Sequence, residues 1–281
     1  MNKLVKLELT DADLPVTIYY TEDSISHCFV PLCNNIENLY RDSTREPFII
    51  GLGGPPGSGK SVIALTISSY LKNRNLDVTI LPLDGFHLKN EVLKERTIAR
   101  GFKKVTLYEI KGAKETYDME SFLSHLAILR TTNEEFYWPV YSRKIHQPVL
   151  KGIKISDRKK IFIIEGNYLF LGASPWNSVR EFFDLGIFII PLKRLLRKRI
   201  INRKLTGGIS KKEARRHYRK ADRINIKEVL KESTGYDHII RQKSRYRYIL
   251  MYNFYSPIAS SISFFLLCRI CRNSSMSYSK A

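Results

Sequence analysis

The chain has 281 residues, which is long enough to bury a sizeable core, and its hydrophobic content of 43% is ordinary for a soluble protein. This composition excludes a chain that is too polar to fold. The 47 Lys and Arg residues outnumber the 27 Asp and Glu residues and give a formal net charge of +20. Such a charge favours anionic partners, namely nucleotides, nucleic acid or an acidic membrane surface, and does not choose among them.

The cysteines do not predict disulfides. The chain opens with MNKLVKLE, which lacks the apolar run of a secretory signal, so we expect a reducing, cytoplasmic location. Cys268 and Cys271 form a C-x-x-C pair, and Cys28 and Cys33 are in principle available as partners for a zinc ion. Nothing else around them resembles a zinc ribbon, so no zinc site is predicted.

Residues 1–46 are predicted to form an N-terminal extension, with a short strand at 16–20 and a helix at 30–40. From Phe48 onward, strand and helix patterns alternate, which predicts a doubly wound α/β fold around a mostly parallel sheet. Residues 47–247 are assigned to this domain. The expected strands are 48–52, 78–83, 135–140, 161–164, 185–190 and 238–240, and the expected helices are 61–73, 119–130, 176–183, 192–204 and 211–231.

A phosphate-binding loop follows the first of these strands. Glycines let backbone N–H groups turn inward around a phosphate, and the following helix directs its partly positive N-terminus at the same anion. We predict that Lys60 contacts the β- and γ-phosphates of a nucleoside triphosphate and that Ser61 ligates Mg²⁺. The residues that match G-x-x-x-x-G-K-[ST] are Gly54, Pro55, Pro56, Gly57, Ser58, Gly59, Lys60 and Ser61.

An acidic residue follows each of two other predicted strands. Asp84 lies just past the strand at 78–83, where ligands bind in open α/β sheets. Behind a phosphate-binding loop it is predicted to accept a hydroxyl proton or to help hold Mg²⁺. Glu165 ends the apolar run at 161–164 and is predicted to hold Mg²⁺ in the manner of a Walker B carboxylate. The alternatives are a turn for Asp84 and a solvated strand end for Glu165.

Residues 193–223 are dense in Lys and Arg and contain Gly207 and Gly208 near their middle. We interpret this stretch as a mobile lid that closes over a nucleotide, brings arginines to the phosphates and excludes water. Many of its side chains are expected to be simply solvated. A nucleic-acid groove is the alternative, but no nucleic-acid-binding motif accompanies the charge.

Residues 248–281 form an apolar tail of unassigned role. No charged residue occurs from Tyr248 to Cys268, a run long enough to cross a membrane. Asn253, Pro257 and several serines weaken this interpretation. A membrane anchor therefore stays open, and a tail that packs poorly or docks on a partner is favoured.

Six motifs occur in order along the chain: GPPGSGKS, LDGFHLKN, IKGAKETYD, WPVYSRKIHQPV, IIEGNYLFL and RKLTGGISKKEA. Together they resemble the P-loop kinases that group with uridine kinase, phosphoribulokinase and bacterial pantothenate kinase, and they are most similar to the bacterial nucleoside/nucleotide kinase branch. The resemblance spans residues 4–248 and does not cover the rest of the tail. It implies a P-loop NTPase fold with a helical lid, and ATP and Mg²⁺ as cofactors.

The resemblance also implies roles in catalysis. Asp84 resembles the general base that deprotonates the acceptor hydroxyl, and Glu165 resembles the carboxylate that helps hold Mg²⁺. Arg199 and Arg203 resemble the lid arginines that stabilise charge on the transferring phosphoryl group. Lys60 belongs to the same catalytic set.

Other positions resemble contacts to the acceptor substrate. They are Tyr141, Arg143 and His146, and His87 in the DGFH motif is expected to join them, with a structural hydrogen bond as the alternative for each histidine. Asp222 and Asn225 match a polar pair in the helix after the lid. Two residues depart from the family pattern: Ser142 stands where aspartate is usual in the branch, and Lys114 stands where proline is usual.

These observations predict a kinase that transfers the γ-phosphoryl group of MgATP to a hydroxyl of a nucleoside, a pantothenate-like molecule or a sugar. One alternative is an NTP-driven switch or hydrolase with a protein or nucleic-acid partner, which Asp84 disfavours. The other is a degenerate protein that binds nucleotide without turnover, which Ser142 and the tail suggest. The sequence does not predict the oligomeric state.

Overall fold

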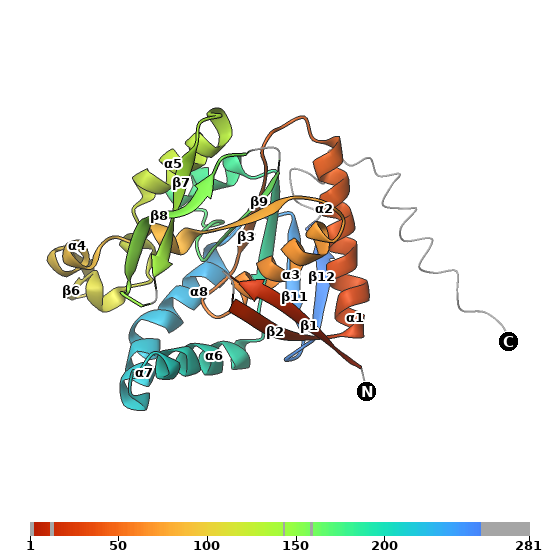
Figure 1. Cartoon of the computed structure of the whole chain (residues 1–281). Coiled ribbons are helices and arrows are strands. Elements are labelled where there is room, and N and C mark those ends of the chain that lie inside the picture. The colour runs from red at the N-terminus through yellow and green to blue at the C-terminus, as the bar shows by residue number, and fades with distance from the viewer. Residues whose placement is uncertain (1–2, 12–13, 143, 158–159, 254–281) are drawn as a thin grey trace.

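The computed structural model describes residues 3–11, 14–142, 144–157 and 160–253, and a six-stranded sheet lies at its centre (Figure 1). The order of the strands is β12-β11-β10-β3-β9-β4, and within this sheet only β12 runs antiparallel to its neighbour. The sheet is therefore mostly parallel, as predicted. The strands are β3 (Phe48–Gly53), β4 (Val78–Pro82), β9 (Ile161–Gly166), β10 (Leu185–Ile190), β11 (His238–Gln242) and β12 (Tyr248–Tyr252).

Apolar side chains cover both faces of this sheet. On β3, Phe48, Ile50 and Leu52 belong to one buried cluster, and Ile49 belongs to a second cluster on the other face. The residues of β9 alternate between the two clusters in the same way. A strand buried on both faces appears in the sequence as a continuous apolar run, which is why the sequence predicts these strands.

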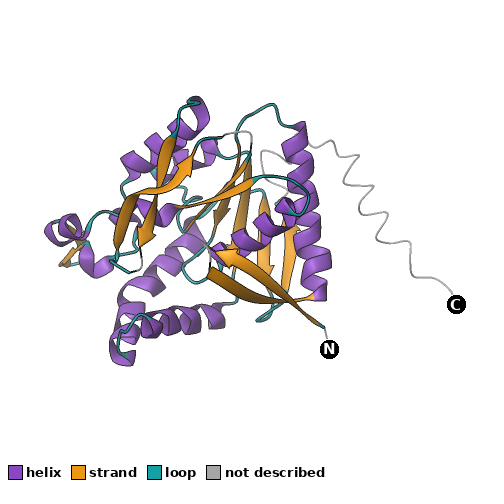
Figure 2. Cartoon of the chain, viewed as in Figure 1, coloured by secondary structure: helices purple, strands orange, loops and turns teal. Residues whose placement is uncertain are grey.

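Helices cover both faces of the sheet (Figure 2). α2 (Val30–Asp42) and α3 (Lys60–Lys72) contribute to the first cluster, and α5 (Met119–Thr131) contributes to the second. The helix expected at 176–183 is a 3₁₀-helix, η5 (Trp176–Phe182). Its buried residues, Trp176 and Val179, are three positions apart, a spacing that a 3₁₀ turn places on one side.

The N-terminal extension packs against the sheet. β1 (Leu4–Asp11) and β2 (Leu14–Thr21) form an antiparallel hairpin, followed by α1 (Glu22–Ser24), the π-helical η1 (Ile25–Phe29) and α2. The rings of Tyr20 and Phe29 lie 5.6 and 6.0 Å from the ring of Tyr248 in β12. The backbone N–H of Tyr248 donates to Ser24 Oγ at 2.8 Å. The extension therefore contacts the last strand of the sheet.

The predicted strand at 135–140 forms, but it does not join the central sheet. β7 (Phe136–Ser142) pairs antiparallel with β8 (Gln147–Ile155) in a separate two-stranded sheet. Gly85 shows why the hairpin lies where it does, because a Cβ built there would be 2.0 Å from the carbonyl oxygen of Pro139. The missing side chain lets β7 approach the residues that follow β4.

A group of short elements connects β4 to α5, and the sequence predicts none of them. β5 and β6 pair as a hairpin, and a small apolar cluster that includes Leu93 and Leu107 holds the group together. The elements are η2 (Leu83–Phe86), α4 (Asn90–Glu95), β5 (Thr97–Arg100), β6 (Lys103–Thr106), η3 (Tyr108–Ile110) and η4 (Lys114–Thr116).

The predicted lid is helical. α6 (Lys193–Thr206) ends at Gly207, and α7 (Lys211–His217) begins after Ser210, whose side chain accepts from the N–H of Glu213. The single helix expected at 211–231 is interrupted. A π-helical segment, η6 (Tyr218–Asp222), separates α7 from α8 (Arg223–Glu232).

The first residues of the predicted tail belong to the sheet, as β12, and the structure describes the tail as far as Asn253. The rest of it, with Cys268 and Cys271, lies outside the described residues. Among the residues described, no helix is long and apolar enough to cross a membrane. Cys28 and Cys33 are buried free thiols, and burial raises the pKa of each to about 12.

We expect a chain cut after Asn253 to melt at the same temperature as the full chain, and a chain cut after Arg247 to melt about 10 °C lower. The second cut removes Tyr248, which is 6% exposed and packs on the N-terminal extension. Differential scanning calorimetry of the three proteins makes the comparison. Equal melting temperatures after both cuts would show that β12 is dispensable. The division of the chain into extension, main domain and tail stays a prediction, although β12 (Tyr248–Tyr252) pairs with the sheet of the main domain.

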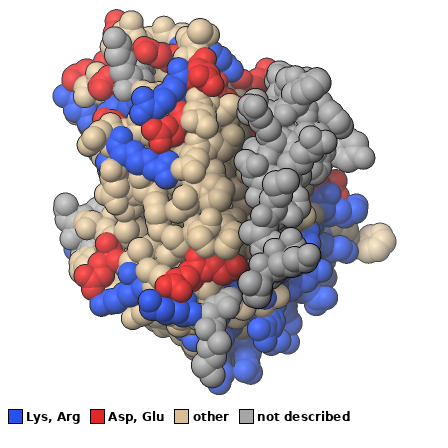
Figure 3. Space-filling view, turned by 90° about the vertical axis from the view of Figure 1, so that its right-hand side faces the viewer, with Lys and Arg blue, Asp and Glu red and all other residues tan. Residues whose placement is uncertain are grey.

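Charged side chains are spread unevenly over the face in Figure 3. Lys and Arg lie at the upper left and along the lower edge of this face, Asp and Glu lie among them, and the middle of the face carries no charge.

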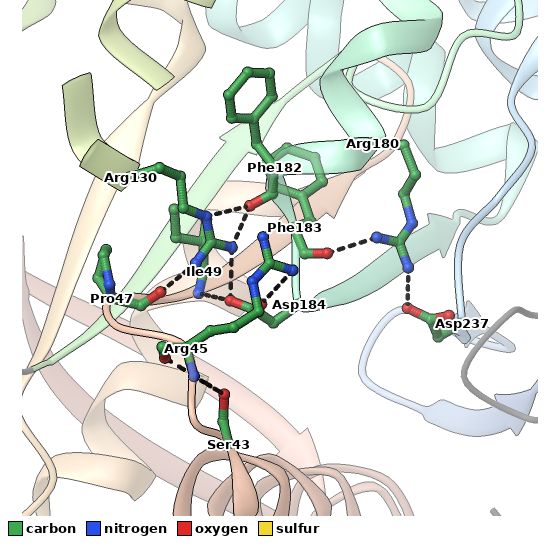
Figure 4. Close-up of polar contacts among 10 residues, drawn as sticks. All are labelled: Ser43, Arg45, Pro47, Ile49, Arg130, Arg180, Phe182, Phe183, Asp184 and Asp237. Atoms are coloured by element: carbon green, nitrogen blue, oxygen red, sulfur yellow. Dashed lines mark hydrogen bonds and ion pairs between the residues drawn. The ribbon is translucent and has the colours of Figure 1, made fainter. Parts of the chain in front are cut away.

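A buried ion pair joins three segments at the end of the sheet opposite the phosphate-binding loop (Figure 4). Arg130, in the last turn of α5, contacts Asp184 at 2.7 Å, and their side chains are only 10% and 6% exposed. The Arg130 guanidinium also donates to the backbone carbonyls of Pro47 and Phe182. The Asp184 carboxylate accepts from the N–H of Ile49 at 2.7 Å. The pair thus connects α5 to the starts of β3 and β10.

Replacing Arg130 by Met is expected to lower the free energy of unfolding by about 3–5 kcal/mol, because it leaves the buried Asp184 without its main partner. Arg45 is the matched control. Its guanidinium contacts the same carboxylate at 3.0 Å but is 55% exposed, so Arg45→Met is expected to cost at most about 1 kcal/mol. Urea unfolding of both variants measures the difference. Equal losses would contradict the assignment of Arg130 as the structural partner.

Candidate active site

The phosphate-binding loop lies between β3 and α3, at the edge where the parallel strands end. Gly57 and Gly59 have φ angles of 77° and 95°, in the left-handed region that favours glycine. A Cβ built on Gly59 would meet no atom within 4 Å, so the loop borders open space at the start of α3. The first N–H groups of a helix lack partners within the helix and bind anions. The loop therefore has a geometry that suits a phosphate.

Lys60 extends across this loop and is only 9% exposed. Its Nζ donates to the carbonyl oxygens of Gly54 at 3.1 Å and Pro55 at 3.2 Å, and to Asn167 Oδ1 at 2.7 Å. Burial lowers the pKa of Lys60, and the negative charge of Glu165 opposes this effect. These hydrogen-bond partners are neutral, so an anion at the loop would stabilise the buried cation.

Ser58 gives a further sign that the loop fits a phosphate. Its Oγ is buried and has no hydrogen-bond partner among the described residues. A buried hydroxyl without a partner is costly, and a ligand oxygen would supply one. The loop, Lys60 and Ser58 together therefore fit the phosphates of a nucleotide.

Ser61 and Glu165, the two residues predicted to hold Mg²⁺, contact each other. Ser61 Oγ, in the first turn of α3, donates to Glu165 Oε1 at 2.9 Å. Glu165 lies near the end of β9, which pairs with β3 directly before the loop. Hydroxyl and carboxylate oxygens are ligands that Mg²⁺ accepts, so this pair fits a magnesium ion beside the phosphates.

Asp84 lies in η2, directly after β4. Its Oδ1 accepts a hydrogen bond from the hydroxyl of Tyr117 at 3.1 Å. Burial, and then the charge of Asp84, raise the pKa of Tyr117 well above its usual value, so the hydroxyl stays a donor. Asp84 also acts electrostatically on Lys60, where its charge raises the pKa. The structure thus brings Asp84, Glu165 and Lys60 into one site.

His87 and Tyr141 lie beside Asp84 on the acceptor side. His87 Nδ1 contacts the backbone carbonyl of Asp84 at 2.9 Å, so this nitrogen carries the proton. The His87 ring lies 4.0 Å from the ring of Tyr117 and 5.4 Å from that of Tyr141. Burial lowers the pKa of His87, which therefore stays neutral near pH 7.

His146 reaches this region through its backbone. Its φ is 53°, and its carbonyl oxygen accepts from Lys111 Nζ at 2.9 Å and from Asn90 Nδ2 at 3.3 Å. The side chain of His146 is exposed. Arg143 lies outside the described residues. Ser142 ends β7, and its Oγ accepts from the N–H of Ile145 at 3.5 Å.

The two lid arginines lie on the nucleotide side. Arg199 Nη1 donates to the carbonyl oxygens of Gly57 at 3.2 Å and Ser58 at 3.4 Å, in the phosphate-binding loop itself. Arg203 is exposed on the same helix, and its charge helps to lower the pKa of Lys60. The lid helix α6 therefore places Arg199 against the phosphate-binding loop.

The polar pair after the lid divides between two tasks. The Asp222 carboxylate contacts Lys204 of α6 and His217 of α7, each at 3.3 Å, and so joins the lid helices. Burial acts to raise the pKa of Asp222, but these two partners lower it below its usual value. Asn225 Nδ2 donates to the carbonyl of Gly112 at 3.0 Å, and its buried Oδ1 has no hydrogen-bond partner in the described part of the chain.

Lys114, the second departure from the family pattern, forms an ion pair with Glu228 of α8 at 2.6 Å. This contact joins η4 to the helix that follows the lid. The lysine that stands in place of the usual proline therefore has a local ion-pair partner.

Sequence reasoning missed three residues of the site: Tyr117, Asn167 and Lys111. Asn167 accepts from Lys60, and its side chain also bonds to Tyr117, so a polar row runs from Lys60 to Asp84. Lys111 Nζ lies 5.2 Å from the centre of the Tyr141 ring. All three stand in motifs quoted above, but only the fold shows which of their neighbours they contact.

Comparison with known families gives a consistent result. Residues 49–244 match the model of the phosphoribulokinase / uridine kinase family. An Escherichia coli relative, described as the uncharacterized protein YggC, is 30% identical over 247 residues, which are 87% of this chain and 98% of the relative. A pantothenate kinase of Enterococcus faecalis is 33% identical over 162 residues, which are 56% of this chain and 49% of that enzyme.

Comparison with solved structures agrees. A Silicibacter protein described as a "putative fructose transport system kinase" has a TM-score of 0.67 and 26% identity. The match covers 76% of this chain and 98% of that protein. The D-glycerate 3-kinase of Cryptococcus neoformans has a TM-score of 0.57 at 14% identity, which shows a shared fold alone.

Proposed function

The chain belongs to the phosphoribulokinase / uridine kinase family, and on this premise we propose that it transfers the γ-phosphoryl group of MgATP to a hydroxyl group of a small polar metabolite. One observation supports the proposal most: a row of hydrogen bonds through Tyr117 and Asn167 connects the Asp84 carboxylate with Lys60 of the phosphate-binding loop. A carboxylate in that position can accept the proton that a hydroxyl group must lose when it attacks the γ-phosphoryl group.

The nucleotide half of the site neutralises charge. Lys60, the loop N–H groups and the start of α3 together offset the charge of the β- and γ-phosphates. Ser61 and Glu165 would hold Mg²⁺, which would offset the charge of the phosphates. Arg199 and Arg203 would stabilise the charge that the transferred group carries in the transition state. Little covalent chemistry is left to the protein, so positioning supplies most of the acceleration.

The acceptor half of the site handles a proton. Asp84 would accept the proton of the attacking hydroxyl, and the Tyr117 hydroxyl holds this carboxylate in one orientation. His87, which is hydrogen-bonded to the backbone carbonyl of Asp84, lies beside Tyr141 on the same side of the site. Both side chains would contact the acceptor. The similarity to a relative named pantothenate kinase supports a small polar metabolite as the acceptor. The cytoplasmic location stays a prediction.

The test is a screen of the purified full chain with MgATP against a panel of hydroxyl metabolites: nucleosides, pantothenate, glycerate and simple sugars. ADP release is the readout. We expect one class of acceptor to increase the rate well above that of MgATP alone. ADP release that no acceptor stimulates would favour a hydrolase or switch, and nucleotide binding without any turnover would favour a degenerate kinase.

A further inference from the structure

Gln242, the last residue of β11, is 3% exposed and stands beside the lid helix. Its Oε1 accepts from Arg199 Nη1 at 3.3 Å and from the backbone N–H of Leu192, directly before α6, at 3.4 Å. Its Nε2 donates to the hydroxyl of Tyr248 at 3.0 Å and to the carbonyl of Arg245 at 3.2 Å. Both ends of this buried amide therefore have partners.

These partners fix the orientation of the amide. A guanidinium and a backbone N–H can only donate, so the oxygen of Gln242 must face Arg199 and Leu192. The carbonyl of Arg245 can only accept, so the nitrogen must face away from them. Gln242 consequently offers Arg199 an acceptor at a fixed point, 3.3 Å from Nη1.

The same Nη1 of Arg199 contacts the phosphate-binding loop at Gly57 and Ser58. An arginine on a long side chain loses conformational entropy when it is held in one place, and a fixed neutral acceptor offsets part of that cost without cancelling the charge. A carboxylate at this position would neutralise Arg199 and compete with phosphate. Glutamine therefore suits a residue that must hold an arginine and leave its charge available.

Tyr248 extends this arrangement to the N-terminus of the chain. The hydroxyl of Tyr248 also makes a hydrogen bond with Arg199. Burial raises the pKa of Tyr248, and the charge of Arg199 and this hydrogen bond oppose the effect. The ring of Tyr248 packs on Tyr20 and Phe29 of the extension. Gln242 of β11 and Tyr248 of β12 thus meet at the guanidinium, and the extension packs behind Tyr248.

We propose that Gln242 is a positioning residue that holds Arg199 against the phosphate-binding loop, with Tyr248 and the N-terminal extension as its support. The proposal rests on the proposed function, because it assumes that Arg199 stabilises the transferring phosphoryl group. It goes beyond that function because it assigns the buried amide of Gln242, and the extension that packs behind Tyr248, to the positioning of a catalytic arginine.

The experiment compares the affinity of the full chain for MgADP with its affinity for MgADP plus aluminium fluoride, which mimics the transferring phosphoryl group. Isothermal titration calorimetry measures both, so no acceptor is needed. For Gln242→Met we expect MgADP to bind within about two-fold of wild type and the aluminium fluoride complex to bind about 10-fold more weakly. Arg199→Ala should weaken that complex about 100-fold. Lys243→Met, at the exposed neighbouring residue, is the control and should bind both as wild type does.

A double variant separates positioning from general damage. If Gln242 acts through Arg199, Arg199→Ala/Gln242→Met should bind the aluminium fluoride complex within about two-fold of Arg199→Ala alone. Losses that multiply, or a Gln242→Met variant that binds the complex as wild type does, would overturn the proposal.

Two further outcomes also decide the question. If Gln242→Met does not fold, as its melting temperature will show, Tyr248→Phe takes its place. This variant keeps the ring and removes the hydroxyl, and it should weaken the complex about three-fold through Arg199. A Tyr248→Phe variant that binds the complex as wild type does overturns the support role. A wild-type chain that binds no MgADP would instead refute the proposed function, and the positioning role would fail with it.

Discussion

Lys60→Ala is expected to abolish phosphoryl transfer. The side chain is the buried cation of the phosphate-binding loop, and its removal leaves the charge of the β- and γ-phosphates without its main offset. We expect a loss of at least about 10³-fold in kcat, with a weaker effect on nucleotide affinity because the loop N–H groups remain. Steady-state rates with the best acceptor of the screen, together with calorimetric binding of MgATP, measure both effects.

Lys72→Ala is the matched control, since Lys72 is an exposed lysine at the other end of the same helix. It should leave rate and affinity unchanged. A melting temperature for Lys60→Ala guards against simple unfolding. Near-normal turnover by a folded Lys60→Ala protein would contradict the assignment of the phosphate-binding loop.

Asp84→Asn is expected to cut transfer to the acceptor by about 10²–10⁴-fold, the usual range for a lost general base, while MgATP binding stays largely intact. Asparagine keeps the shape and the Oδ1 acceptor that Tyr117 uses, but it cannot take up a proton at neutral pH. Transfer rates and MgATP titrations of the same preparations test the two halves of this expectation.

Glu165→Gln should differ from Asp84→Asn, because it removes a charge beside Ser61 and should weaken Mg²⁺-dependent nucleotide binding as well as the rate. Titrations with and without Mg²⁺ separate the two variants. Asp77→Asn, at an exposed carboxylate paired with Lys160, is the neutral control. If Asp84→Asn retains most of its transfer rate, the general base must be another residue.

Much of the nucleotide half of the site could be predicted from the sequence. The loop motif spans eight consecutive residues, so its geometry is local, and the apolar runs around it identify the strand and the helix. The position of Glu165 could be predicted for the same reason, because this residue follows an apolar run that is typical of a buried strand. Parallel pairing of β9 with β3 then brings Glu165 to Ser61.

The rest of the site depends on contacts that no local pattern encodes. Tyr117 and Asp84 are separated by 33 residues, Asn167 and Lys60 by 107, and Gln242 and Arg199 by 43. Each pair meets because of how the chain folds around the sheet. A polar residue in a loop gives no sign of which distant partner it will find.

The hairpin of β7 and β8 shows the same limit in the fold. Residues 135–140 have a strand pattern, but their partner β8 carries Lys151 and Lys154 at exposed positions and does not resemble a buried strand. The pairing therefore could not be predicted, and β7 was expected in the central sheet. Gly85 gives a physical reason for its actual place, but only once the contact with Pro139 is known.

The most direct test of a kinase function follows the γ-phosphoryl group itself. Wild-type chain is incubated with ATP labelled at the γ-phosphorus, Mg²⁺ and the acceptor panel, and the labelled products are separated by chromatography. We predict that the label appears in an organic phosphate ester, and that Asp84→Asn forms this ester at least about 10²-fold more slowly. Label that appears in inorganic phosphate alone, at the same rate with every acceptor and without any, would contradict the account.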